Sequence, residues 1–137
     1  MIDQLYIDEA RRIRKEYLTN LFYIVEKEDE MKSYMNTIEN IKEELNEDES
    51  KINDNLYTDK VNELNKNIEK VKVYITKYMN KIQQLDKAQK RLYNNIKEKH
   101  IGITDEEMQK EIMNKIIDID EKFKKVKKNT LDKFDLD

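Results

Sequence analysis

The chain has 137 residues, which suits one domain, and 42% of them are charged whereas 37% are hydrophobic. Acidic and basic residues are interleaved and give a net charge of −3, so no strong field favours nucleic acid or an acidic membrane. The absence of cysteine excludes disulfides and thiolate metal sites, and no apolar run approaches the roughly 20 residues that span a bilayer.

The first periodic segment predicts a helix over about residues 3–48, because apolar residues recur there every seven positions. Its apolar stripe is wide as far as about residue 28 and narrow beyond it. A helix that touches two neighbours needs a wide stripe, so the first half is predicted to contact two helices and the second half one.

A loop is predicted over about residues 49–57, within the stretch NEDESKINDNLYTD. Asn, Asp and Ser are common in turns because their side chains form hydrogen bonds with the local backbone. The stretch does not match a calcium-binding loop, because the central glycine is missing and the oxygen ligands are wrongly spaced.

A second helix is predicted over about residues 58–100, followed by a turn at 101–104. From Val61 to Ile96, alternating steps of three and four residues meet an apolar residue at almost every position. A seam sustained over so many repeats is typical of a coiled coil and argues against a disordered segment.

The turn contains the only glycine of the chain, Gly102, which suits the left-handed position that ends a helix. Thr104 and Glu107 have the spacing of a capping box at the start of the next helix. Ile103 and Met108 have the spacing of the hydrophobic staple that accompanies such a box. These residues together predict a well-defined bend.

A third helix is predicted over about residues 105–128, with a tail at 129–137. The fold class that follows is all-α: an elongated antiparallel three-helix arrangement with coiled-coil character, in a single domain over residues 1–137. Two long helices form a hairpin, and the shorter third helix packs on its proximal half. Folding about residue 53 places residue 25 opposite residue 81.

The distal half of this arrangement, about residues 28–78, is then a bare two-helix hairpin whose apolar seam is only partly covered. We expect a second copy or another protein to cover it; the alternative is that the stems of Lys and Glu side chains seal it. The predicted interaction surface consists of Met31, Met35, Ile38, Ile41, Leu45, Leu64, Ile68 and Val71.

No set of reactive groups predicts an enzyme. The only histidine, His100, has no nucleophile nearby and suits the last turn of a helix, where a cation meets the negative end of the dipole. One glycine cannot build a phosphate-binding loop. We therefore expect no catalytic residues, cofactor, metal or small-molecule substrate.

Two basic clusters are candidates for weak phosphate binding. They consist of Arg11, Arg12 and Arg14 in the first helix and of Lys124, Lys125, Lys127 and Lys128 in the third. Acidic residues flank both clusters, and such mixed charge is more typical of a solvated helix face.

These features favour a non-catalytic structural or scaffold protein that acts through helix–helix contacts, in a larger assembly or a homo-oligomer. The alternative is a small helical binding module that regulates or inhibits a partner protein, of the kind that phages and viruses encode. A nucleic-acid accessory protein is a third possibility. The expected partner is protein, with no membrane, and the expected location is intracellular and soluble, in the cytoplasm or within a virion.

Overall fold

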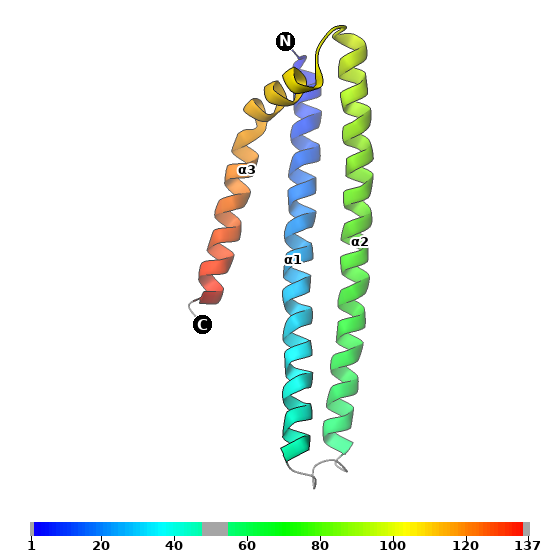
Figure 1. Ribbon diagram of the computed structural model, residues 1–137, viewed down its shortest axis with the longest axis vertical. Helices are drawn as coiled ribbons and strands as arrows, with labels where there is room; N and C mark the ends of the chain where they lie inside the picture. Colours follow the sequence, from blue (N-terminus) through cyan, green and yellow to red (C-terminus); the bar gives the residue numbers. More distant parts are fainter. Residues whose placement is uncertain (1, 48–54, 136–137) are drawn as a thin grey trace. The chain divides into compact units, whose positions relative to one another are not determined.

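The computed structural model describes residues 2–47 and 55–135, with side chains described as far as residue 125. These residues form three helices, α1 (Gln4–Glu47), α2 (Asn55–Lys99) and α3 (Asp105–Asp135), and no strand (Figure 1). The helix α1 packs against both α2 and α3, which confirms the predicted all-α three-helix arrangement. None of the three helices, over its described length, has an apolar stretch that could cross a membrane.

The helix bounds differ from the predicted ones at two places. The helix α2 begins at Asn55, three residues before the predicted start at 58. The helix α3 continues to Asp135, through most of the segment predicted to be a tail. Neither proline nor glycine occurs in that segment, so nothing in it stops a helix that has already formed.

The chain divides into two compact units, and the boundary lies inside two continuous helices. The first unit comprises Met1–Phe22 and Asn80–Asp137, and the second comprises Tyr23–Met79. No loop, glycine or proline marks this division in the sequence.

The first unit has a core to which all three helices contribute. The spacing of three and four residues puts the buried side chains of each helix on one face, as the seams predict. Ile96 and Met108 are fully buried, and Ile7 is 1% exposed. The core consists of Ile2, Ile7, Ala10, Ile13, Leu85, Leu92, Ile96, Met108, Ile112, Ile116 and Ile119.

The pairing of α1 with α2 in this unit is displaced from the predicted register. The Nζ atom of Lys81 lies 3.9 Å from Oε2 of Glu16, whereas residue 25 was predicted to lie opposite residue 81. The pairing on α1 is thus displaced towards its N-terminus, and the earlier start of α2, by three residues, accounts for part of this displacement.

The turn between α2 and α3 has the predicted parts. Gly102 has a φ of 94°, in the left-handed region. The Oγ1 atom of Thr104 accepts a hydrogen bond of 3.1 Å from the Glu107 amide, which confirms Thr104 as the N-cap of α3. Ile103 and Met108 both belong to the core region of the first unit, as a hydrophobic staple requires.

The second unit pairs the remaining part of α1 with the first part of α2. Two residues of each helix are buried between them, namely Ile38, Ile41, Ile68 and Val71. Towards Tyr23 and Met79 the contact becomes aromatic. The ring of Tyr78 lies 5.2 Å from that of Tyr23 and 6.5 Å from that of Tyr74, between ring centroids.

Candidate functional site

The basic cluster of α1 serves mainly to hold the first unit together. The Nη1 atom of Arg11 donates a hydrogen bond of 2.7 Å to Asp118, and its Nη2 donates one of 2.7 Å to the Lys115 carbonyl. Arg14 donates two hydrogen bonds, of 2.8 and 3.2 Å, to the carboxylate of Asp120. Both acceptor carboxylates belong to α3, so these arginines tie the first helix to the third.

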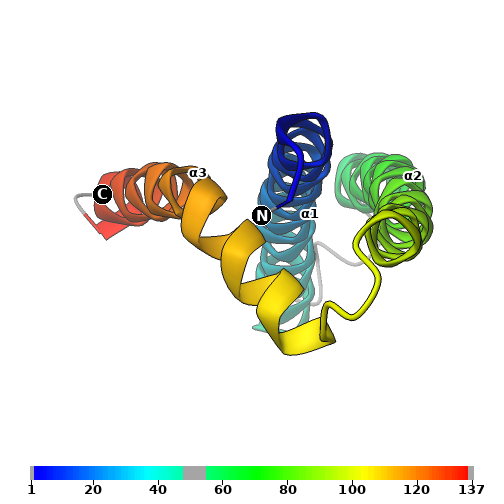
Figure 2. The same ribbon diagram turned by 90° about the horizontal axis from the view of Figure 1, so that it is seen from above.

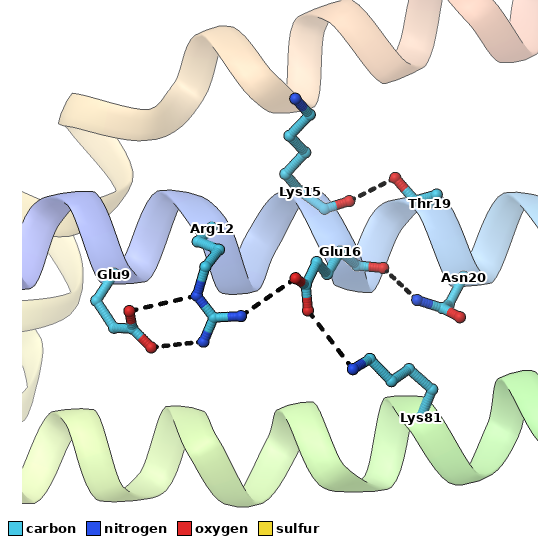
Figure 3. Close-up of polar contacts among 7 residues, drawn as sticks. All are labelled: Glu9, Arg12, Lys15, Glu16, Thr19, Asn20 and Lys81. Carbon is cyan, nitrogen blue, oxygen red and sulfur yellow. Dashed lines mark hydrogen bonds and ion pairs between the residues drawn. The ribbon is translucent and has the colours of Figure 1, made fainter.

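The third arginine of the cluster, Arg12, lies on the α2 side of α1 (Figure 3). It donates hydrogen bonds of 3.3 and 2.6 Å to Glu9 and one of 3.1 Å to Glu16. The same Glu16 approaches Lys81 of α2, so charges of alternating sign run along α1 and end on α2. Hydrogen bonding by Arg12 lowers the pKa of Glu9 below its ordinary value.

The three arginines of the predicted phosphate-binding cluster, Arg11, Arg12 and Arg14, are all paired with carboxylates of the same chain. Phosphate binding at the two basic clusters stays a prediction. Lys124 and Lys125 are exposed on α3. Lys127 and Lys128 lie outside the residues whose side chains the structure describes.

The predicted interaction surface is also largely covered. Ile38, Ile41, Ile68 and Val71 are buried between α1 and α2, so they cannot contact a partner in this structure. Met31, Leu45 and Leu64 are half-buried, and only Met35, at 53% exposure, remains open. At these four positions the two helices cover each other's apolar side chains, because each β-branched side chain fits between the two backbones. Binding of a partner at the remaining, half-buried positions stays a prediction.

A groove of about 550 Å³ lies between α1 and α2 at the end of the first unit that carries the α2–α3 turn. Tyr6, Ala88 and Leu92 supply apolar walls, and the ion pair of Asp3 with Lys99 lies at the rim. Hydrogen bonding by Lys99 lowers the pKa of Asp3. Glu9, Arg12, Arg91 and Asn95 also line the groove, so its walls carry both apolar and charged side chains.

The most exposed large apolar side chains of the described residues lie at this same end. Leu5, which lines the groove, is 80% exposed, and Ile101, in the turn, is 94% exposed. The N-terminus of α1 and the α2–α3 turn share this end of the unit (Figures 1 and 2). Neither side chain supports the fold, because Gly102 makes the turn and Ile103 packs against the core.

The exposed face of α2 at this end carries two charges that stay unpaired within the described part of the chain. Arg91 lines the groove and, unlike the other three arginines, forms no ion pair there. Glu98, also exposed, forms none either. We call the set of Leu5, Ala88, Arg91, Glu98 and Ile101 the turn-end surface.

Sequence periodicity did not identify this surface, although a signal for it exists. Leu5 and Ile101 are apolar residues that fall off the heptad lines, and an apolar residue off the seam has no place in the predicted core. Arg91 could not be identified from the sequence as a member of this surface, because the register between the helices decides whether it has an ion-pair partner.

The only histidine lies at the same end, half-buried. Its backbone amide donates a hydrogen bond of 2.8 Å to the Ile96 carbonyl, as in a last helical turn. Its Nε2 atom is buried and has no hydrogen-bond partner. Over residues 2–47 and 55–135 no group of three or more His, Cys, Asp or Glu side chains is placed to hold a metal.

Comparisons with known proteins do not assign the chain to a family. No family model matches the chain, and searches of the curated proteins and of the solved structures found no significant match.

Proposed function

We propose that this protein is a non-catalytic structural protein that acts through helix–helix contacts and binds its protein partner with the turn-end surface. The observation that carries the proposal is the exposure of Leu5, at 80%, in the wall of the groove and of Ile101, at 94%, in the turn at the same end of the unit. Among the described residues, the next most exposed large apolar side chains are Leu56 and Val73, each at 70%.

Exposed apolar side chains at one end of the unit favour binding to another protein. Burying one Leu or Ile side chain stabilises a complex by about 1.5–3 kcal/mol, whereas an exposed one contributes nothing to folding. Apolar side chains that gather at a groove are typical of surfaces that bind another protein. Arg91 and Glu98 would add orientation, because charges at the edge of a contact select its register.

A helical binding module that regulates one partner is the second candidate, and the groove favours it. An apolar side chain of a partner could enter the groove of about 550 Å³ between the two helices. A role with nucleic acid has less support, because the arginines of α1 are engaged by carboxylates.

Site-specific photo-crosslinking in the native cell tests the proposal. A photoreactive amino acid replaces Ile101 in one variant and Lys77, an exposed residue of α2 in the second unit, in a control. We expect protein adducts at position 101 and none at position 77. Adducts that contain this chain or several assembly subunits support the scaffold, and adducts to one enzyme support the regulator.

Equal labelling at both positions, or none at either, would contradict the proposal.

A further inference from the structure

From the turn-end surface, and resting on the proposed function, we infer that the partner is a second copy of this chain. The two copies meet through the last turns of α2, antiparallel, about a two-fold axis between Asn94 and Asn95. The segment RLYNNIKE, residues 91–98, is complementary to itself in this arrangement.

The inference depends on two charged residues of α2, Arg91 and Glu98. An antiparallel contact centred between residues 94 and 95 places Arg91 of each copy opposite Glu98 of the other. The two residues are seven positions apart, so on one helix they lie within about 20° of each other. Both are exposed, and neither has a partner within the described part of the chain. The contact therefore forms two identical ion pairs from charges that a single copy leaves unpaired.

The size of the contact sets its strength. Asn94 and Asn95, at the centre of the contact, are polar and exposed. A small, polar contact is typical of a weak, reversible dimer. Dimerisation should appear over roughly 1–500 µM protein and become weaker as salt is added, since exposed ion pairs are screened.

Sedimentation of charge-reversed variants tests the inference. Arg91→Glu puts two pairs of carboxylates in contact, and Glu98→Arg puts two pairs of cations in contact. Each variant alone should dimerise at least about tenfold more weakly than the wild type. An equimolar mixture of the two should recover dimers, because in the mixed dimer both contacts pair opposite charges again.

A control variant completes the test. Lys77→Glu makes the same change of charge on α2, away from the contact, and should leave the dimer unchanged. Circular dichroism of every variant verifies that the helices remain.

A monomer at every concentration, or a mixture of the charge variants that does not dimerise, would show the self-contact to be wrong. If position 101 still crosslinks a different protein in cells, the proposed function stands without the self-contact. If position 101 crosslinks nothing, both fail.

Discussion

Arg14 and Asp120 join α1 to α3 through two parallel hydrogen bonds, of 2.8 and 3.2 Å. The two side chains are 34% and 22% exposed. Arg12, only two residues earlier, is 51% exposed and bonds only to Glu9 and Glu16 of its own helix. Of these two neighbouring arginines, Arg14 therefore joins two helices, whereas Arg12 forms ion pairs only within its own helix.

Replacing Arg14 should weaken the docking of the third helix. We expect Arg14→Ala to lower the free energy of unfolding by about 1–2 kcal/mol, because a charged, two-point hydrogen bond in a half-buried place is lost. Arg12→Ala removes a pair within one helix and should cost only a few tenths of a kcal/mol. Urea unfolding followed by circular dichroism measures both, and equal losses would contradict the assignment of Arg14 to the helix–helix contact.

The seam of the second unit is tested by two valines that lie two residues apart on α2. Val71 is 4% exposed and Val73 is 70% exposed. Val71→Asp should lower the free energy of unfolding by about 3 kcal/mol or more, because an unpaired charge would be buried. Val73→Asp should change it by less than about 0.5 kcal/mol. Thermal unfolding distinguishes the two; a tolerated Val71→Asp would mean that the seam is assigned to the wrong face.

The bend at Gly102 can be tested through backbone conformation alone, since a Cβ atom built at this position meets no atom within 4 Å. Its φ of 94° is unfavourable for alanine, so Gly102→Ala should lower the free energy of unfolding by about 1 kcal/mol. Asn tolerates the left-handed region better than alanine, so Gly102→Asn should cost less. The melting temperatures of the two variants check this order, which the reverse result would contradict.

Stability should fall on the acid side. Hydrogen bonding by Arg11 holds the pKa of Asp118 below its ordinary value of 3.8, and the Ile2 amide holds that of Glu111 below 4.5. Because both values are lower in the folded state than in the unfolded chain, their contribution is complete above the unfolded values. It is lost as pH falls through the folded values.

The measurement is the melting temperature as a function of pH. It should be nearly constant between about pH 6 and 8 and decline below about pH 4.5. The curve of Asp118→Asn should lie below the wild type near neutral pH and approach it in acid. Glu63→Gln, at an exposed site on α2, is the control and should follow the wild type throughout. A constant difference between Asp118→Asn and wild type at all pH values would exclude this role for Asp118.

Periodicity and turn chemistry were enough to predict the helices and the bend. The seam from Val61 to Ile96 and the cap at Thr104 are local patterns, and local patterns depend on few residues. The register between α1 and α2 was not predictable in the same way. It depends on where α2 begins, and the Asn- and Asp-rich stretch before it does not define that start.

The ion pairs and the turn-end surface could not be predicted from the sequence either, because they also depend on the register between the helices. With charges of both signs on the exposed faces of the helices, Arg11, Arg12 and Arg14 each have several carboxylates within reach in different registers. Only the packed helices show that Asp118 and Asp120 are the partners of two of them. The exposure of Ile101 likewise follows from the direction in which the turn leaves α2.

The contacts between α1 and α3 have a consequence for the order in which the chain acquires its structure. Ile2 and Glu111, Arg11 and Asp118, and Arg14 and Asp120 are each more than a hundred positions apart. During synthesis, the first and second helices are complete before the acidic partners on α3 have been translated. Until then the core residues of α1 and α2 lack the α3 side chains that complete the core, and Arg11 and Arg14 lack their partners on α3. The nascent chain should therefore be most prone to mispairing before α3 emerges from the ribosome.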